Sequence, residues 1–267
     1  MKIAFIGGGM MAEAIISAII TKGALSPEAI TVSDIDQDRL KILGERYGIG
    51  CTPDNCRAIQ GKNIVILAVK PQVIRKVATG LRRELRPDQS VISILAGVGI
   101  ATLKQHLDHD AIIRVMPNTP SQIGEGMSVW TATETVPPGH KSIVCTILAA
   151  MGKEIYFDAE KYIDMATAIS GSGPAYVFLI TEALTDAAVH IGIPRKTASE
   201  LVLQTFLGSA RFAQVSDKHL SELRNMVTSP GGTTAAGLFR LEEGGLRATL
   251  TQAVIAAYQK AKELGKE

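Results

Sequence analysis

The sequence predicts an α/β protein in which a doubly wound, mainly parallel sheet is followed by an all-helical region. In the first part of the chain, short apolar runs of strand type alternate with helical segments, which is the pattern of a parallel sheet covered by helices. After Tyr162 the strand pattern disappears, and apolar residues recur only at helical spacing. We therefore expect two domains, at residues 1–160 and residues 161–267.

Composition limits the class of protein. The chain has 267 residues, of which 46% are hydrophobic, and a formal net charge of +2, so it can bury a sizeable core and produces no large field of one sign. Lysine and arginine are scattered, which argues against nucleic-acid binding. No stretch reaches the ~18–20 apolar residues of a membrane span, because glycines interrupt the apolar N-terminus and Glu13 charges it. We expect no nucleic-acid partner and no membrane.

The three cysteines and five histidines form no metal-ligand pattern. An odd, sparse set of cysteines indicates reduced thiols and a cytoplasmic setting. We expect no bound metal and no catalytic role for the histidines, which are interpreted as core or surface residues.

The first predicted strand, residues 3–6, runs straight into a glycine-rich turn and then into a helix over residues 13–20. The turn reads G-x-G-x-x-A, and strand, turn and helix in immediate succession are the context that a dinucleotide-binding fingerprint of Rossmann type requires. The second glycine lets backbone approach a pyrophosphate. We expect a cofactor-binding loop made of Gly7, Gly8, Gly9, Met10 and Met11. The alternative is a tight strand–helix turn without a ligand.

The second predicted strand, residues 30–33, ends at Asp34, about 20 residues after the glycines, where a carboxylate would accept from a ribose 2′-hydroxyl. Asp34 and Asp36 would repel a 2′-phosphate, although Arg39 and Lys41 could partly offset them. This pattern favours NADH over NADPH. A helix cap or strand-end turn is the competing interpretation of Asp34.

Further strands are predicted at residues 64–69, 91–95, 112–116, 127–130 and 154–157, with a helix over residues 141–151. The run at 64–69 is continuously apolar, as expected of a parallel strand buried on both faces. Loops at the carboxyl ends of such strands form the ligand crevice of a doubly wound sheet. These loops contain Lys70-Pro71, Ala96-Gly97 and Pro117-Asn118. A solvated strand-end charge is the alternative for Lys70.

In the helical half, apolar residues recur at helical spacing over residues 177–191, 198–210 and 250–261. Others lie off these faces, among them Phe178, Leu179, Leu203 and Leu207. Helices that are apolar on several faces usually pack against a partner. We expect a homodimer built by this half.

Between two helical segments lies Thr228-Ser229-Pro230-Gly231-Gly232-Thr233-Thr234-Ala235-Ala236-Gly237. Paired glycines admit a ligand close to the backbone. A helix that opens at Thr233 would offer free N–H groups to an anion. We interpret this loop as the site of a small carboxylate substrate. A plain inter-helix loop is the alternative.

Taken together, these motifs resemble the pyrroline-5-carboxylate reductase family. The resemblance rests on the loop at residues 229–238, with residues 5–10, 68–72, 116–120 and 170–176 matching in the same order, and it spans essentially the whole chain. It implies reduction of 1-pyrroline-5-carboxylate to L-proline by NADPH or NADH, the last step of proline biosynthesis. A Rossmann domain, a helical dimerisation domain and sometimes higher oligomers of dimers are also implied. The active site would lie between nucleotide domain and substrate loop, completed across the dimer.

The resemblance also assigns residues. Ser229, Gly231, Gly232 and Thr233 would bind the substrate carboxylate, and Thr234 would hydrogen bond the ring nitrogen as the catalytic residue. A helix-cap hydroxyl is the alternative for Thr234. Lys70 and Asn118 would line the nicotinamide side, and the cofactor groove would be shaped by Ala68, Val69, Pro71 and Ala96. Ser170 and Ser172 either lie near the same cleft or only begin a helix with Pro174 in its first turn.

One departure concerns the coenzyme. Many family members carry Asn-Arg-Ser at the end of the second strand, which suits a 2′-phosphate, whereas this chain has Asp34-Ile35-Asp36. The family often uses NADPH, so the preference between NADH and NADPH stays open.

On the helix after Pro174, Glu182 and Asp186 lie four residues apart. They are interpreted as part of a solvated helix face.

Two competing functions remain. A dehydrogenase of the β-hydroxyacid group would carry a catalytic lysine on the helix over residues 174–191, and that segment has none. A nucleotide-sensing protein without activity would not need the intact loop at Gly231-Gly232-Thr233-Thr234.

Overall fold

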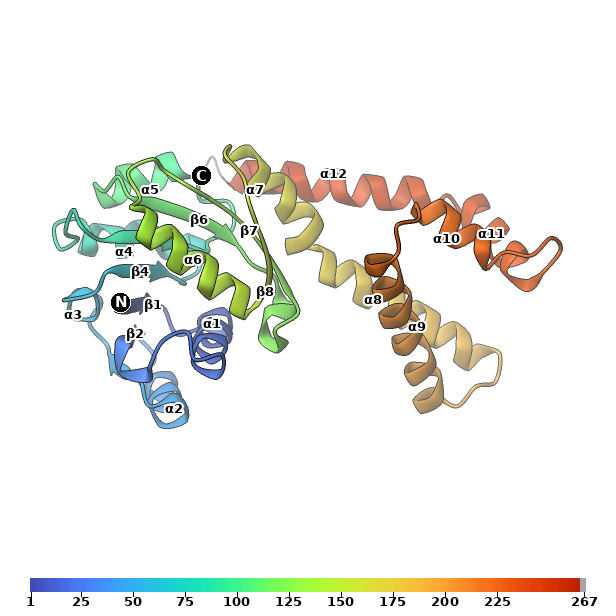
Figure 1. Cartoon of the computed structure of the whole chain (residues 1–267), viewed down its shortest axis with the longest axis horizontal. Coiled ribbons are helices and arrows are strands. Elements are labelled where there is room, and N and C mark those ends of the chain that lie inside the picture. Colours follow the sequence, from blue (N-terminus) through green and yellow to red (C-terminus); the bar gives the residue numbers. More distant parts are fainter. Residues whose placement is uncertain (265–267) are drawn as a thin grey trace. The chain divides into compact units, whose positions relative to one another are not determined.

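The computed structural model describes residues 1–264, which form two compact units (Figure 1). The first unit comprises residues 1–172 together with the end of the chain from Ala257, and the second comprises residues 173–256. The domain boundary expected after residue 160 remains a prediction.

The first unit is built around an eight-stranded sheet with the order β3-β2-β1-β4-β5-β6-β7-β8. Neighbouring strands are parallel except β6 and β7, which are antiparallel. The doubly wound, mainly parallel sheet is thus confirmed. The strands are β1 (Ile3–Ile6), β2 (Ile30–Ser33), β3 (Gly50–Thr52), β4 (Ile64–Leu67), β5 (Ser90–Ser93), β6 (Ile112–Met116), β7 (Gly126–Ala132) and β8 (Gly152–Tyr156).

Helices connect these strands and cover the sheet (Figure 1). The α-helices of this unit are α1 (Met10–Thr21), α2 (Gln37–Tyr47), α3 (Asn55–Ile59), α4 (Ile74–Leu81), α5 (Ile100–Leu107), α6 (Pro138–Ala150) and α7 (Lys161–Ala166). Short 3₁₀ turns lie at η1 (Pro27–Ala29), η2 (Pro71–Val73) and η3 (Thr119–Ile123), and a π-helical turn, η4 (Thr167–Gly171), follows α7.

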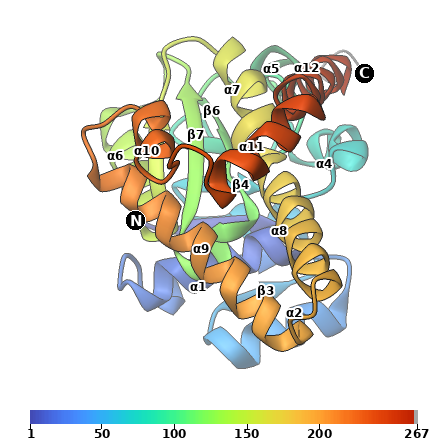
Figure 2. The ribbon, with the colours of Figure 1, turned by 90° about the vertical axis from the view of Figure 1, so that its right-hand side faces the viewer.

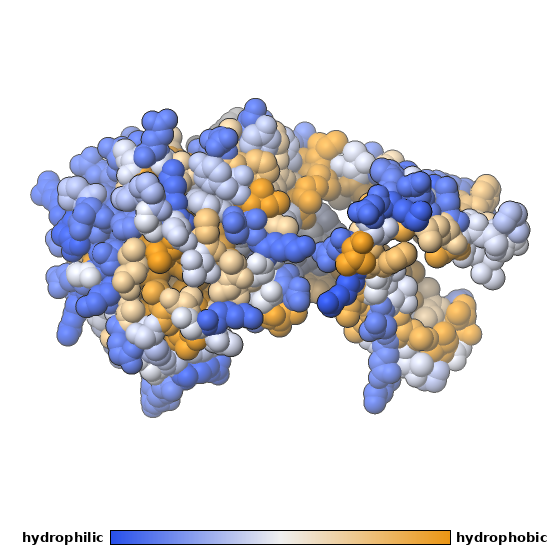
Figure 3. Space-filling view, viewed as in Figure 1, coloured by the Kyte–Doolittle hydropathy of each residue, from blue (hydrophilic) through white to orange (hydrophobic). Residues whose placement is uncertain are grey.

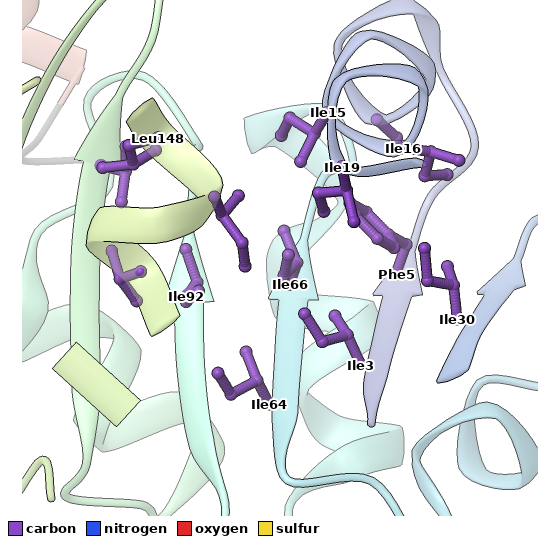
Figure 4. Packing of buried hydrophobic residues seen from close by; sticks show 14 of the residues in the cluster. Ile3, Phe5, Ile15, Ile16, Ile19, Ile30, Ile64, Ile66, Ile92 and Leu148 are labelled. Carbon is purple, nitrogen blue, oxygen red and sulfur yellow. The ribbon is translucent and has the colours of Figure 1, made fainter. Parts of the chain in front are cut away.

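Alternation along the strands divides the core into two layers. On β1, Ile3 and Phe5 belong to one buried cluster while Ala4 and Ile6 belong to the other. In the first cluster, Ile15, Ile16 and Ile19 of α1 pack beside residues of β1 and β4 (Figure 4). Both faces of these strands are covered, which explains why their sequences are apolar without interruption.

The second unit is entirely helical. It contains α8 (Gly173–His190), α9 (Arg195–Val215), α10 (Leu220–Met226), α11 (Thr233–Glu243) and the first part of α12 (Leu246–Leu264). Helices α8 and α9 meet at the short turn over residues 191–194 (Figure 2). Large apolar side chains on both helices are exposed, among them Phe178, Leu179, Leu203 and Leu207. The space-filling view shows hydrophobic surface on the helical unit (Figure 3).

One helical run, Lys161–His190, is long and apolar enough to cross a membrane by length and composition alone. Only 17% of its most apolar window is buried within the chain. An apolar helix that the chain itself leaves uncovered requires another apolar surface.

Candidate active site

The order of the sheet reverses at β1, whose neighbours are β2 and β4. In a doubly wound sheet, a ligand crevice forms at the carboxyl ends of the strands flanking such a reversal. Gly7 leaves β1 with φ +101°, and its N–H donates to the Ser33 carbonyl at 2.7 Å. A Cβ on Gly7 would lie 2.7 Å from the Ala68 carbonyl oxygen. Glycine therefore lets the loops after β1, β2 and β4 meet.

The turn that follows fits a pyrophosphate. Gly9 is the N-cap of α1 and provides no side-chain cap, so helix geometry leaves the first N–H groups of α1 without an internal acceptor. A Cβ on Gly9 would meet no atom within 4 Å, which shows that the space beside the turn is open. Met10 is exposed and Met11 half-buried at the same helix start. Open backbone N–H groups at a helix N-terminus are suited to phosphate.

Asp34 contacts the glycine loop directly. Its Oδ2 accepts from the Gly8 N–H at 2.6 Å, and its Oδ1 accepts from the Asp36 N–H at 3.0 Å. Asp36 in turn caps α2 by accepting from the Arg39 N–H. The helix cap that competed for Asp34 is thus provided by Asp36. Asp34 itself tethers the end of β2 to the predicted pyrophosphate turn.

A cluster missed by the sequence analysis joins α1 to α2. Glu13 pairs with Arg39 and Arg46, and it accepts a hydrogen bond from the Tyr47 hydroxyl at 3.0 Å. Arg39 Nε also donates to the Gly8 carbonyl at 2.6 Å. Nothing in local spacing could reveal these contacts, because Glu13 and its partners are separated by 26 to 34 residues.

The remaining predicted cofactor residues follow β4, β5 and β6. Ala68, Val69 and Pro71 are half-buried in the loop after β4, and Lys70 is exposed there as the N-cap of η2. Ala96 is half-buried in the loop after β5. These loops lie at the carboxyl ends of neighbouring parallel strands, which brings the residues to one edge of the sheet.

Asn118, after β6, is buried and its side-chain amide is already engaged. Its Nδ2 donates to the Ser170 carbonyl at 3.0 Å, and its Oδ1 accepts from the Met127 N–H at 2.9 Å. Asn118 therefore fixes the π-helical turn at Ser170 against the loop after β6. Such turns are frequent at functional sites.

The predicted substrate loop lies in the helical unit. Gly231 has φ +68°, and the Gly232 N–H donates to the Ser229 carbonyl at 3.1 Å, which closes a tight turn. Gly232 is then the N-cap of α11, again without a side-chain cap. The N–H groups of Thr233 and Thr234 have no intrahelical acceptor in this geometry. The helix opening at Thr233 is confirmed, and a helix N-terminus of this kind is suited to an anion.

Another group unforeseen from the sequence is Arg114 on β6, which is 3% exposed. Its guanidinium donates to Glu160 Oε1 at 2.8 Å and to Asp164 Oδ1 at 2.6 Å. Glu160 Oε1 also accepts from the Ile100 N–H at 2.7 Å. These ion pairs hold α7 and the residue before it, Glu160, against the sheet. We therefore interpret Arg114, Glu160 and Asp164 as structural.

Glu182 and Asp186 are both exposed on α8, as the solvated-face interpretation expects. Asp186 pairs with Arg195 at 2.8 Å across the turn between α8 and α9. Within residues 1–264, no group of three His, Cys, Asp or Glu side chains lies close enough to hold a metal ion.

A doubly wound sheet with an open glycine turn at its reversal point defines a dinucleotide-binding protein of the Rossmann class. Comparison with known proteins agrees with this class and narrows it. Residues 2–97 match the family model for NADP oxidoreductase, coenzyme F420-dependent, and residues 160–264 match the model for pyrroline-5-carboxylate reductase dimerisation. The pyrroline-5-carboxylate reductase of Synechocystis sp. is 41% identical over 270 residues, covering 100% of this chain and 99% of its own. The chain belongs to the pyrroline-5-carboxylate reductase family.

Solved structures show the same relationship. A pyrroline-5-carboxylate reductase from Coxiella burnetii superposes with a TM-score of 0.92 at 40% identity, covering 100% of this chain and 99% of its own. The pyrroline carboxylate reductase of Plasmodium falciparum, solved with NADP bound, gives a TM-score of 0.91 at 33% identity, with coverages of 99% and 98%. The expected fold class, a Rossmann-type sheet followed by a helical dimerisation region, is thus confirmed.

Proposed function

We propose that this chain reduces the C=N bond of 1-pyrroline-5-carboxylate to give L-proline, the last step of proline biosynthesis, with NADH or NADPH as reductant. The observation that carries the proposal is identity of about 40% to pyrroline-5-carboxylate reductases over the full length of both chains. Further support comes from the glycine turn and the loop before α11, each of which begins a helix at a glycine N-cap without a side-chain cap.

In this reaction the reduced nicotinamide supplies the hydride that the C=N carbon accepts. We assign the pyrophosphate to the turn at Gly7, Gly8 and Gly9 and to the first N–H groups of α1, at Met10 and Met11. The loops with Ala68, Val69, Lys70, Pro71 and Ala96 form the rest of the cofactor groove. Asn118 acts there as a positioning residue, since both ends of its amide are engaged.

The substrate carboxylate is assigned to the loop before α11. Backbone N–H groups at Thr233 and Thr234 and the exposed Ser229 and Thr233 hydroxyls provide donors, while Gly231 and Gly232 shape the turn. Thr234 orients the ring nitrogen. A hydroxyl is a poor acid, so the proton comes from solvent or from substrate that is already protonated. Holding two reacting carbons in near-attack contact supplies several kcal/mol of rate acceleration.

Asp34 favours NADH. A 2′-phosphate would meet its carboxylate and that of Asp36, while a free 2′-hydroxyl could donate to Asp34. The position of Arg39 supports this preference. Its guanidinium pairs with Glu13 and donates to the Gly8 carbonyl, so its charge is already engaged within the protein. The chain is proposed to work without a metal and in the cytoplasm.

The helical half is proposed to form a homodimer. Such dimers can in turn assemble into higher oligomers. Support comes from the match of residues 160–264 to the dimerisation model and from exposed apolar side chains on α8 and α9. In this proposal the apolar run at Lys161–His190 is covered by a second copy of the chain rather than by lipid.

Steady-state oxidation of NADH and of NADPH with 1-pyrroline-5-carboxylate, followed at the nicotinamide absorbance, tests the function. Turnover with either coenzyme, and formation of L-proline in equal amount, is the expected result. A folded protein that binds nucleotide yet turns over with neither coenzyme would exclude the reductase activity.

A further inference from the structure

Arg39 is the first cation after β2, close in sequence to where a Rossmann protein meets the 2′ position of the adenosine ribose. Its guanidinium is turned into the protein. Nε donates to the Gly8 carbonyl at 2.6 Å, and Nη2 pairs with Glu13. The side chain is 22% exposed. Arg39 is therefore held by the protein instead of being presented to a ligand.

Glu13 is the residue that holds it. One carboxylate oxygen pairs with Arg39 and the other with Arg46, at 2.6 Å, and with the Tyr47 hydroxyl, at 3.0 Å. Burial raises the pKa of Glu13, but hydrogen bonds from Arg39 and Tyr47 and the two positive charges outweigh it and keep the pKa below its usual value. Glu13 is thus ionised at neutral pH and occupies Arg39 and Arg46 together.

The rest of the β2 end is acidic. Asp34 bonds to the Gly8 and Asp36 N–H groups, Asp36 caps α2, and Asp38 is exposed in the first turn of α2. Arginine is the side chain best suited to a phosphate, because its planar donors match two phosphate oxygens at once. Here the arginine nearest to the β2 end in sequence, Arg39, is already paired with Glu13.

We propose that Glu13 is a positioning residue that sets coenzyme preference by holding Arg39 away from the 2′-phosphate position, so that the chain discriminates against NADPH. The inference rests on the proposed function only insofar as the chain binds a nicotinamide dinucleotide. A purely structural role for Glu13, in joining α1 to α2, would affect NADH and NADPH equally.

The test compares the two coenzymes in Glu13→Gln, which keeps the size of the side chain and removes its charge. We expect the ratio of kcat/KM for NADPH to that for NADH to rise about threefold to tenfold, through KM rather than kcat, as one charge near a phosphate is removed and a guanidinium is released. Dissociation constants from the quenching of nicotinamide fluorescence should shift in the same ratio. Glu13→Asp, which retains the charge, should restore part of the original preference.

Two further variants separate the route through Arg39 from a general charge effect. In Glu13→Gln/Arg39→Gln the gain for NADPH should disappear. Glu45→Gln, at an exposed position on α2, removes the same charge away from the partners of the Arg39 guanidinium, which are Glu13 and Gly8, and should leave the ratio unchanged. If Glu13→Gln fails to fold, Glu13→Ala repeats the comparison, because alanine favours the helix and leaves no acceptor for Arg39.

An unchanged ratio in folded Glu13→Gln overturns the proposal, as does a gain that survives the loss of Arg39. Failure of the proposed function gives a different result. The wild-type chain would then turn over with neither coenzyme, while the fluorescence titrations would still report the effect of Glu13 on the two dissociation constants.

Discussion

Thr234 is the second residue of α11 and is half-buried, next to a helix start whose N–H groups are open to an anion. Its neighbour Thr233 is exposed at the same terminus. A half-buried hydroxyl at this place can bond a bound ring more rigidly than an exposed one, because fewer water molecules compete for it. At the scale of single residues, catalysis is therefore expected to depend more on Thr234 than on Thr233.

Replacing Thr234 with alanine should lower kcat by about tenfold to a hundredfold, the range for losing one hydrogen bond to a charged group. Thr234→Ser keeps the hydroxyl and should retain most of the rate. Steady-state kinetics with 1-pyrroline-5-carboxylate at saturating coenzyme measures the effect. An alanine variant as fast as the serine variant would contradict the assignment.

Gly232 tests how the same loop binds the carboxylate. A Cβ at this position would collide with the Ser229 hydroxyl and would lie 3.2 Å from the Ser229 carbonyl oxygen. Gly232→Ala should displace Ser229 and raise KM for the imine by about tenfold, equivalent to losing one charged hydrogen bond. Gly237→Ala, where a Cβ meets no atom within 4 Å, is the matched control and should leave KM unchanged. Equal KM values in the two variants would refute this loop geometry.

Among structural elements, α7 is held to the sheet by an ion pair group that is largely buried. Arg114 bonds to Glu160 and Asp164, which are 33% and 23% exposed in their side chains. The Asn118 amide fixes the π-helical turn that follows α7. Two polar anchors thus hold α7 and the turn after it against the sheet within the first unit.

Arg114→Gln should destabilise the first unit by about 2–3 kcal/mol, because it leaves two partly buried carboxylates without their cation. This loss is smaller than the roughly 3–5 kcal/mol expected for a fully buried pair, because both carboxylates reach solvent. Urea unfolding followed by circular dichroism measures the change. Arg195→Gln breaks an exposed pair with Asp186 and should cost less than about 1 kcal/mol. Similar losses in both variants would show that burial does not strengthen the Arg114 group.

The sequence predicted the central elements well and the peripheral contacts poorly. Strands β1, β2 and β6 begin and end where their apolar runs do, because burial on both faces leaves a strong local signal. The runs at 64–69 and 91–95 extend past their strands, since β4 ends at Leu67 and β5 at Ser93. Strand β3, with only Gly50–Thr52, carries no such signal.

In the candidate site, the glycine turns could be predicted from the sequence because they depend on local backbone geometry. Gly7 and Gly231 do adopt positive φ. The partners of Glu13 and Arg114 could not be read, because their contacts join segments that are far apart in the chain. Long-range ion pairs leave no periodic pattern, so their detection requires the fold.

At the scale of the whole molecule, the helical unit has too little core of its own. Phe178 and Leu179 are each 65% exposed on α8, and Leu207 is 60% exposed on α9. Burying one such side chain is worth about 1.5–3 kcal/mol. Several of them, contributed by two copies, would supply a stable interface, whereas an isolated chain would leave them in water.

We therefore expect a dimer at micromolar concentration that one charge can disrupt. Leu207→Asp should raise the dimer dissociation constant by at least about a hundredfold, because it removes apolar contact and buries a carboxylate without a partner. Gln204→Asp adds the same charge to an exposed polar position on α9, and the dimer should survive. Sedimentation equilibrium over a range of protein concentrations distinguishes the species. A monomeric wild-type chain in detergent-free buffer would contradict the dimer, and a chain that stays in solution only with detergent would indicate that the apolar helices meet lipid instead.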